Sequence, residues 1–540
     1  MNHKLTRKMR VLVVDDQVLA KGYLKYSMEE LGFQDIDYVD KVTHAINAVR
    51  STHYDLIICS YELKQEQDGY FFYEQIKENN DLPPSTAFVF ISADTTPDIV
   101  HSIVELQPDD FLAKPFTVRE LNKRLTRVLT RKQALRPIYR LVEMNQLDKA
   151  LSEIENFLTE PKNADFFALA LKLKGELLLA CGYNEQAKEF YQAIINVQNF
   201  TWAQLGLVRC HIVLDEDDDA EKRILQLAFR PDSMLAAYDL LTALQIKQKE
   251  FDVALETVGV ASDVSPRNVK RHHTALDLAR LTHDYEIQFE AAKRIVKYAK
   301  NSIHDKPEIY LNVARAGIDF AMTSEQKQTS KLVKQVSDYL KQLKSNHPKA
   351  DVNDQLSVIN ARMLYLQDEA DNAKAMLEQL SDAVLEAQSV EALLDKAKAF
   401  HDVGLHESAL KILDNVEMRC KQDPNQSELF FKYVQQEKAE KDAIRISPKE
   451  LNNSAVRQYH QGELKEALNT FRQAFTVMPK NASIALNLLQ AAAISVRDNG
   501  SSPYSKQMID NCLKTVENGE LSAEQSQRYQ RVKEVLKDLE

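Results

Sequence analysis

The sequence is poor in residues that break helices, with only 12 glycines and 15 prolines among 540 residues. Because these two residues disfavour helix interiors most strongly, their scarcity favours a largely helical chain. The five cysteines are scattered and form no C-x-x-C pair. This pattern argues against a disulfide framework or a zinc site, and it favours reduced thiols in the cytoplasm.

Long hydrophobic runs are also missing. The longest apolar stretch, residues 485–496, is short and is interrupted by Asn487 and Gln490, so it cannot span a bilayer. The apolar run after the basic N-terminus is too short for a signal peptide. The net charge of −11 and the lack of a basic helix argue against nucleic acid as a partner. We therefore expect a cytoplasmic protein that binds neither membranes nor nucleic acid.

The chain is long and is rich in hydrophobic residues that can form cores. Single hydrophobic cores rarely grow beyond about 250–300 residues, so 540 residues predict at least two domains. Hydrophobic residues make up 44% of the sequence, which excludes a disordered chain.

Short apolar runs alternate with helical patterns in residues 1–133. The runs lie at residues 11–14, 56–59, 87–91 and 110–112, with a weaker fifth at 36–39. Strands that are buried on both faces read as continuous apolar runs, and their alternation with helices implies a parallel sheet. We therefore predict an α/β domain with a five-stranded parallel sheet for residues 1–133.

Polar residues follow four of these runs. They are Asp15 and Asp16, Ser60, Ser92 and Lys114. In open parallel sheets the functional residues gather at the carboxyl ends of the strands. These five side chains are therefore expected at one edge of the sheet, where they would form a common pocket.

The arrangement resembles the receiver domain of two-component response regulators, which has a flavodoxin-like fold. The resemblance implies that Asp15 and Asp16 are the acids on the Mg²⁺ side and that Ser92 is the switch hydroxyl. It further implies that Lys114 is the cation on the phosphoryl side, that Phe111 is the switch aromatic and that the Lys114-Pro115 bond is cis.

Ser60 departs from the family, in which an aspartate at this position accepts the phosphoryl group. A serine hydroxyl is a weak nucleophile without an adjacent base, and Mg²⁺ loses one carboxylate ligand. We therefore predict a pseudo-receiver that is not phosphorylated, needs no cofactor and binds Mg²⁺ at Asp15 and Asp16 weakly or not at all. The alternatives are a non-native substitution at Ser60 and an unusual chemistry of that residue.

Residues 134–540 show a recurring helix–turn–helix pattern with a period near 34 residues. The second-helix alanines Ala187, Ala220 and Ala254 follow one another at intervals of 33 and 34 residues. The residues expected to pack between helices are Gly175, Ala187, Trp202, Gly206, Ala220, Ala254, Ala455, Ala467 and Pro479. The pattern resembles tetratricopeptide repeats, which implies an all-α superhelix, here with C-terminal capping helices. An irregular helical domain and a related helical solenoid are the alternatives.

Together the two parts predict a non-enzymatic signalling adaptor in a two-component pathway. Solenoids present extended surfaces to protein partners, so we expect a protein in the repeat groove. The receiver could additionally mediate a homodimer. The alternatives are a phosphorylation-responsive regulator that uses an atypical receiver chemistry, and a transcription-related regulator.

Overall fold

The computed structural model describes residues 6–63, 67–324, 326–380, 388–424, 426–500, 502–519 and 521–537. The chain separates into two compact units. The first comprises Met1–Arg271 and Tyr298–Asp305, and the second comprises His272–Lys297 and Lys306–Glu540. No helix among the described residues is both long and apolar enough to cross a lipid bilayer.

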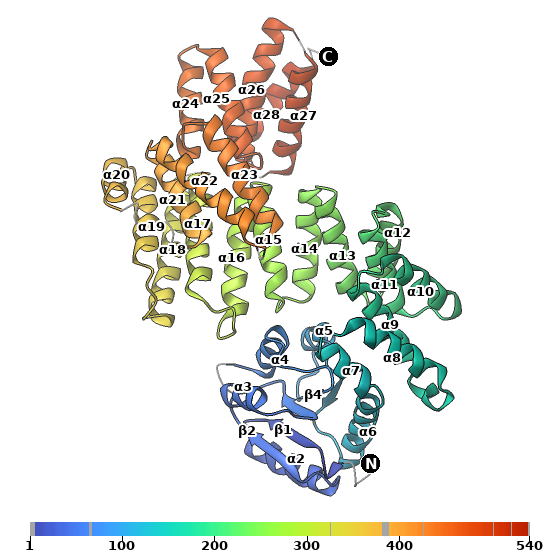
Figure 1. Cartoon of the computed structure of the whole chain (residues 1–540). Coiled ribbons are helices and arrows are strands. Elements are labelled where there is room, and N and C mark those ends of the chain that lie inside the picture. The colour runs from blue at the N-terminus through green and yellow to red at the C-terminus, as the bar shows by residue number, and fades with distance from the viewer. Residues whose placement is uncertain are drawn as a thin grey trace. The chain divides into compact units, whose positions relative to one another are not determined.

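The first unit begins with alternating strands and helices (Figure 1). They are β1 (Arg10–Val14), α2 (Val18–Glu30), β2 (Asp35–Val39), α3 (Val42–Ser51), β3 (Leu56–Ser60), α4 (Gly69–Glu78), β4 (Ala87–Ser92), α5 (Pro97–Leu106), β5 (Asp110–Ala113) and α6 (Val118–Ala134). All pairings are parallel and the strand order is β2-β1-β3-β4-β5. This is the flavodoxin-like order, and it confirms the predicted fold class.

Side chains that alternate along the strands build a core on each face of the sheet. Leu12, Ile57 and Phe88 pack on one face with helices α3, α4 and α5. Val11 and Ile58 pack on the other face with α2 and α6. The inner strands β1, β3 and β4 are therefore buried on both sides, which explains why they read as unbroken apolar runs.

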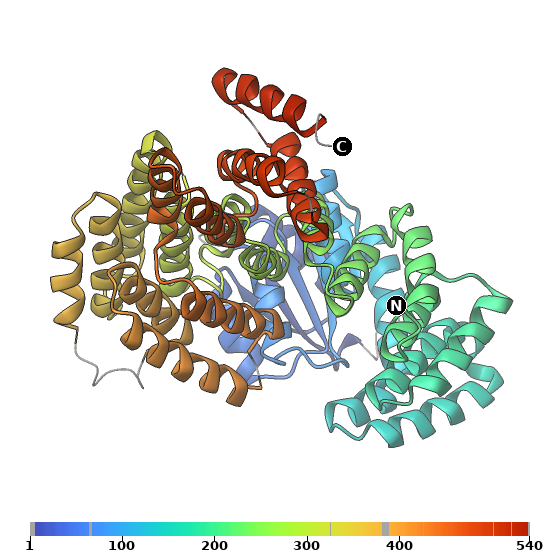
Figure 2. The same cartoon turned by 90° about the horizontal axis from the view of Figure 1, so that it is seen from above.

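Every element described after β5 is helical. The first unit continues with α7 (Arg136–Glu143), α8 (Leu147–Thr159), the 3-10 helix η1 (Pro161–Phe166), α9 (Phe167–Ala180), α10 (Asn184–Val197), α11 (Thr201–Val213), α12 (Asp217–Ala228), α13 (Met234–Lys247) and α14 (Phe251–Val264), and Figure 2 shows them from above. Only Leu135 separates α6 from α7. The division into domains at residue 133 stays a prediction.

The turns inside successive helical hairpins repeat the same backbone conformation. Asp215, Lys249 and His283 all have positive φ and follow one another at intervals of 34 residues. Each stands between the two helices of a pair, where a left-handed residue ends the first helix. The period predicted from the alanines is therefore also a period of the backbone.

Small residues allow the helices of the first unit to approach closely around Tyr191, which is almost fully buried. A Cβ on Gly206 would lie 2.3 Å from the Tyr191 ring, and one on Gly175 would lie 2.5 Å from it. Ala187 is completely buried in the same cluster. The small residues that define the repeat pattern thus make room for one bulky side chain.

Gly206→Ala is expected to lower the free energy of unfolding by about 2 kcal/mol, although alanine is the better helix former by about 1 kcal/mol. The reason is the clash with Tyr191. Urea denaturation followed by circular dichroism measures it. Gly259→Ala is the matched control, because a Cβ at that helical position meets no atom within 4 Å, and it should stabilise slightly. Equal stabilisation by both variants would contradict the packing role of Gly206.

The remaining helices make up most of the second unit, and the first of them starts shortly before the boundary at Arg271. They are α15 (Val269–Leu281), α16 (Tyr285–Ala299), α17 (Pro307–Met322), α18 (Gln326–Asn346), α19 (Asn353–Leu366), α20 (Ala370–Glu378), α21 (Val390–Asp402), α22 (His406–Gln422), α23 (Glu428–Ala443), α24 (Pro448–His460), α25 (Leu464–Val477), α26 (Ala482–Asn499), α27 (Pro503–Asn518) and α28 (Ala523–Lys537).

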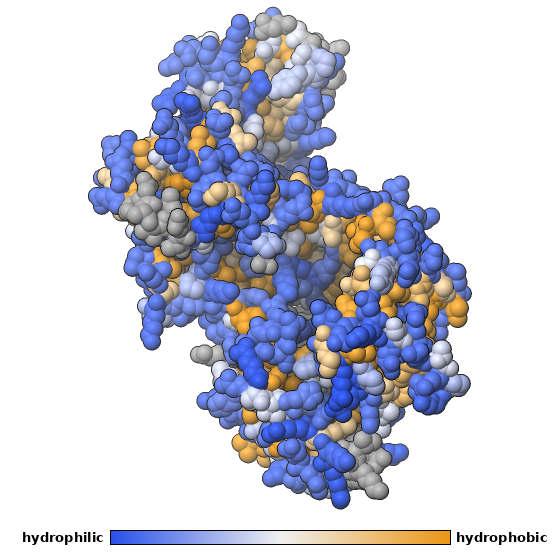
Figure 3. All heavy atoms as spheres, in the orientation of Figure 1, coloured by the Kyte–Doolittle hydropathy of each residue, from blue (hydrophilic) through white to orange (hydrophobic). Residues whose placement is uncertain are grey.

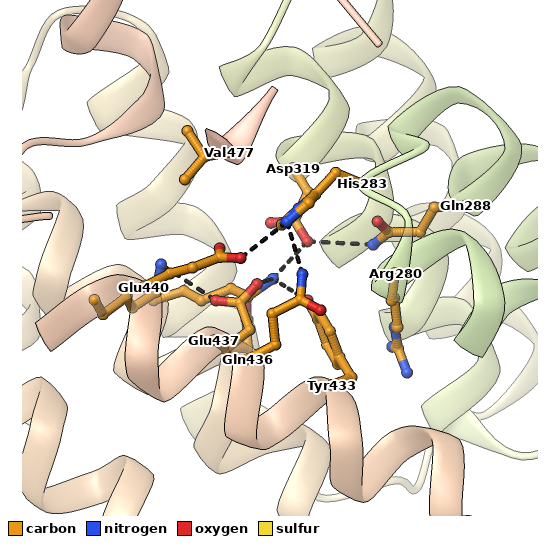
Figure 4. Close-up of polar contacts among 12 residues, drawn as sticks. Arg280, His283, Gln288, Asp319, Tyr433, Gln436, Glu437, Glu440 and Val477 are labelled. Carbon is orange, nitrogen blue, oxygen red and sulfur yellow. Dashed lines mark hydrogen bonds and ion pairs between the residues drawn. The ribbon is translucent and has the colours of Figure 1, made fainter. Parts of the chain in front are cut away.

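The second unit contains a buried network of charges that joins helices far apart in sequence (Figure 4). Lys398 donates to Asp319 over 2.9 Å and lies 3.1 Å from Glu437. Burial alone would raise the pKa of the Asp319 carboxyl. The positive charges of Lys398 and Arg362 outweigh this effect and lower the pKa to about 2. Buried charges of this kind are tolerated only when they are paired, so the network fixes which helices meet.

His283 extends the network toward the last helices of the unit. Its Nε2 lies 2.9 Å from the Glu440 carboxylate and 2.7 Å from the Gln436 amide. Tyr285, which follows it closely, donates from its hydroxyl to the carbonyl oxygen of Val477 over 2.8 Å. Polar contacts therefore tie the turn before α16 to α23, and the first residue of α16 to the end of α25.

The titration of His401 should destabilise the second unit as the pH falls from 7 to 5. His401 is almost fully buried, and burial followed by the charge of Lys441 lowers its pKa to about 4. An unfolded histidine titrates near 6.5, so the unfolded state binds the proton first and the loss at pH 5 is about 2 kcal/mol. Urea titrations at both pH values measure it. His401→Gln should remove this part of the loss, whereas His460→Gln, at an exposed position, should not.

Candidate functional site at the carboxyl edge of the receiver sheet

The polar residues predicted to form a pocket lie where their strands end. Asp15 follows β1, Ser60 is the last residue of β3 and Ser92 is the last residue of β4. Lys114 follows β5, and its peptide bond to Pro115 is cis, as expected. The backbone amide of Lys114 donates to the Ser92 carbonyl over 2.7 Å, which joins the last two strands at this edge.

Lys114 links two of the other residues. Its Nζ donates to Asp15 Oδ2 over 3.1 Å and to Ser60 Oγ over 3.3 Å. Ser60 Oγ in turn donates to the backbone carbonyl of Glu62 over 3.0 Å. The serine hydroxyl is therefore held on both sides, and its proton points to a carbonyl oxygen. It does not point to a carboxylate that could act as a base.

The residues at this edge do not fit the Mg²⁺ ion that receivers hold. Asp15 is almost completely buried, and its second oxygen accepts the backbone amide of Gln17 over 2.8 Å. With the first oxygen on Lys114, its charge is already compensated. The acceptor position supplies a hydroxyl where Mg²⁺ prefers a carboxylate oxygen. Among the described residues, no group of three or more acidic, histidine or cysteine side chains could hold a metal ion.

Ser92 faces a residue that the sequence did not single out. The Glu62 carboxylate accepts from the Ser92 hydroxyl, from the amide of Ala93 over 3.3 Å and from the amide of Asp94 over 3.3 Å. The Asp94 amide also donates to Ser92 Oγ over 3.0 Å. The predicted switch aromatic, Phe111, is half-buried and packs against the core on the α3–α5 side.

The loop after Ser60 returns closely to the end of its own strand. Gly69 opens α4, and a Cβ there would lie 2.2 Å from the Ser60 carbonyl oxygen. Asp68 caps the same helix by accepting the amide of Phe71 over 3.2 Å. The Asp68-Gly69 pair is thus required by the close approach and by the cap.

A residue of the helical array holds this loop. Arg267, which lies between α14 and α15, donates to the Asp68 carboxylate and to the Tyr61 hydroxyl, the latter over 3.0 Å. Its guanidinium also lies over the Tyr70 ring, 4.5 Å from the centroid. Burial opposes the charge, yet Asp68 and Tyr61 raise the pKa of Arg267 above its usual value. The residues on both sides of the loop are therefore bound to one cation.

A second set of contacts in the same unit involves Glu105 at the end of α5. Its carboxylate accepts from the Ser265 hydroxyl over 2.6 Å and lies 2.7 Å from Arg271. Arg271 is almost fully buried and also binds Asp239 on α13 over 2.7 Å. The α4 and α5 side of the sheet is thus joined to the array by several charge pairs.

Sequence reasoning found the pocket but missed Glu62, Arg267 and Glu105. Glu62 had a local signal, since it stands two residues after the acceptor position. Arg267 had none, because its partner Asp68 lies 199 residues earlier in the chain. Charged partners on distant elements leave no periodic trace in a sequence.

The residues predicted to pack between repeats lie in the helical parts of the two units. Of these, Ala220 and Ala254 are completely buried in the first unit, whereas Trp202 is only partly buried and stacks on Phe200. In the second unit, Ala455 and Ala467 are completely buried, and Pro479 stands between α25 and α26.

Comparison with known proteins places the first part of the chain. The model of the response regulator receiver domain matches residues 11–126. The transcriptional activator protein IrlR of Burkholderia pseudomallei is 30% identical over 175 residues, which are 32% of this chain and 73% of IrlR. The sensory transduction protein LytR of Staphylococcus haemolyticus is 27% identical over 27% of this chain and 51% of its own length.

Among solved structures, the signal receiver domain of a signal transduction histidine kinase from Syntrophus aciditrophicus is 28% identical. The match covers 23% of this chain and 90% of that domain, with a TM-score of 0.21. The receiver-domain match and the relationship to IrlR agree with the strand order of the sheet. The chain belongs to the family of two-component response regulators.

Proposed function

We propose that this response regulator is a non-enzymatic signalling adaptor. Its receiver works without phosphorylation, and its helical array binds a protein partner in the manner of a tetratricopeptide-repeat superhelix. The proposal includes the receiver as a surface for a homodimer.

The observation that carries the proposal is the state of Ser60. Its hydroxyl accepts from Lys114 and donates to the Glu62 carbonyl. Phosphoryl transfer to a receiver uses a carboxylate nucleophile at this position, whereas this chain carries a hydroxyl there. A receiver of this kind keeps one conformation and acts as a binding surface.

The contacts of Arg267 and Glu105 support the adaptor role. They tie the α4 and α5 side of the receiver to the array within one compact unit. A receiver that is joined to its output by buried charge pairs suits a rigid binding module better than a switch that must release its output.

The array offers the surface for the partner. Stacked helical hairpins form extended surfaces that bind peptides and proteins, and the repeated turns and buried alanines of this chain support such an array. On the face drawn in Figure 3, hydrophilic residues predominate, with smaller groups of apolar residues between them. Such a mixed surface is typical of non-obligate interfaces.

The test uses the full-length protein with radiolabelled acetyl phosphate and Mg²⁺. We expect no label on the wild type. In a pull-down from the source cells, wild type and Ser60→Ala should recover the same protein partner with the same affinity. Size-exclusion chromatography of the same samples tests the homodimer. Label that is lost in Ser60→Ala would overturn the proposal and would support the phosphorylation-responsive alternative.

A transcription-related role is the second candidate, because the matched relative IrlR is named a transcriptional activator. The alignment covers only 32% of this chain, and the net charge of −11 opposes non-specific DNA binding. A mobility-shift assay with random-sequence and genomic DNA fragments at low salt would reveal this function. Binding that competes with the captured protein partner would favour it over the adaptor.

A further inference from the structure

Three hydrogen-bond donors converge at the end of β4. They are the Ser92 hydroxyl and the backbone amides of Ala93 and Asp94, and all three face the two carboxylate oxygens of Glu62. Such a cluster of a hydroxyl and successive amides is a site for an oxyanion. The Ser92 hydroxyl also lies 2.7 Å from the Asp94 carbonyl oxygen, so its single hydrogen has two acceptors within reach. In this protein the oxyanion comes from the chain itself.

This site lies where the receiver resemblance places the contacts with the phosphoryl group. Ser92 is the residue that the receiver resemblance assigns to contact with the phosphoryl group, and it stands beside Ser60 in the paired strands β3 and β4. Glu62 follows Ser60 by two residues, so its carboxylate reaches the donors from the same loop that would carry a phosphorylated residue.

We propose that the Glu62 carboxylate is a built-in substitute for the phosphoryl group. It occupies the donors of Ser92, Ala93 and Asp94 and thereby excludes an external phosphoryl oxyanion from this edge. A second anion would lose those hydrogen bonds and would meet a like charge at close range. The inference deepens the proposed function and rests on it, since it explains how a receiver keeps one conformation without phosphorylation.

The loop that carries Glu62 is held from both ends. Tyr61 precedes Glu62 and binds Arg267 through its hydroxyl, and Asp68 closes the loop on the same guanidinium. The Tyr61 amide also donates to the Ile91 carbonyl of β4 over 2.8 Å. The backbone next to Glu62 is therefore fixed relative to β4, which keeps the carboxylate on its donors.

The decisive experiment restores the missing nucleophile. In full-length Ser60→Asp, an oxygen of the introduced carboxylate can attack the phosphorus of acetyl phosphate. The new P–O bond forms as the bond to acetate breaks, and acetate leaves with the electron pair. With radiolabelled acetyl phosphate and Mg²⁺, we expect Ser60→Asp alone to be labelled at least tenfold more slowly than Ser60→Asp combined with Glu62→Ala.

Further variants separate charge from shape. Glu62→Gln in the Ser60→Asp background keeps the size and removes the charge, so its labelling should be faster than that of Ser60→Asp alone. Glu29→Ala, an exposed position on α2 of the same domain, should leave the Ser60→Asp labelling unchanged. Thermal melting of each variant confirms that the receiver is folded.

Two results would overturn the inference. One is equal labelling of Ser60→Asp with and without Glu62→Ala. The other is a folded double variant that takes no label. Neither result bears on the adaptor role, which fails instead if the wild-type protein is labelled at Ser60.

Discussion

Arg362→Met should lower the free energy of unfolding of the full-length protein by about 3–5 kcal/mol, the range found when one partner of a buried ion pair is removed. Arg362 is only 3% exposed and donates to Asp319 over 2.8 Å and to Asp395 over 2.7 Å. A third carboxylate, that of Asp402, lies 3.4 Å from its Nε. Without the guanidinium, these buried carboxylates lose their main counter-charge.

Urea denaturation followed by circular dichroism and by proteolysis of the second unit measures this loss. Arg497→Met is the matched control, since Arg497 is 59% exposed and pairs only with its neighbour Asp498. Its effect should stay within about 0.5 kcal/mol. Adding Asp395→Asn to Arg362→Met should recover part of the stability, because one uncompensated charge is removed. A loss below 1 kcal/mol for Arg362→Met would show that the network is dispensable.

The same variant should alter the acid sensitivity of the protein. Asp319 has a pKa of about 2 in the folded state because Lys398 and Arg362 outweigh its burial, against about 3.9 when unfolded. Its ionisation therefore contributes stability above pH 4 that disappears as the pH falls through 2. Without Arg362 the folded pKa rises toward the unfolded value, and this part of the acid dependence should weaken.

The sequence was sufficient for the sheet because the determinants of the sheet are local. Four of the five strands contain a continuous apolar run, such as Val11–Val14 within β1, and a polar residue ends or follows each of these four. The parallel order therefore brings these polar residues to one edge. The helical hairpins were also recognisable, since small residues recur wherever two helices must approach. Both patterns depend on neighbours in the sequence.

The charge network could not be predicted, because its signal is not local. Lys398 lies on α21 among apolar residues, and a single lysine in a helix normally indicates a solvated face. Its partners are on α17 and α23. Only the stacking of helices determines that these charges meet, and no periodicity in one helix reports it.

The proximity of His401 and His406 could not be predicted for a similar reason. Residues five apart do not share a face of one continuous helix, so helical periodicity does not indicate that their rings meet. In the structure α21 ends at Asp402, Gly404 has positive φ and α22 begins at His406, which brings the two rings to 4.8 Å. The glycine between them was the available signal for the turn.

Arg267→Ala should open the loop between β3 and α4. The substitution removes a charge-assisted hydrogen bond to Asp68, a hydrogen bond to Tyr61 and the contact with the Tyr70 ring. Charged hydrogen bonds contribute about 1.5–3 kcal/mol and a desolvated cation–π contact about 2 kcal/mol, and these values overlap, so we expect a local loss of about 3 kcal/mol. That loss corresponds to roughly a hundredfold increase in the population of the open loop.

Hydrogen–deuterium exchange of the peptide that contains Gly69 measures this opening, because the Gly69 amide donates to the Tyr61 carbonyl over 2.9 Å. Lys270→Ala is the matched control on the same segment: Lys270 is 74% exposed and forms an ion pair with Glu78 at the surface, so exchange should change less than threefold. Arg267→Lys keeps the charge but loses the planar fork and should give an intermediate rate. Unchanged exchange in Arg267→Ala would mean that packing alone holds the loop. In that case the receiver would be joined to the array chiefly through Glu105 and Arg271, and the Glu62 carboxylate would be positioned by the strands alone.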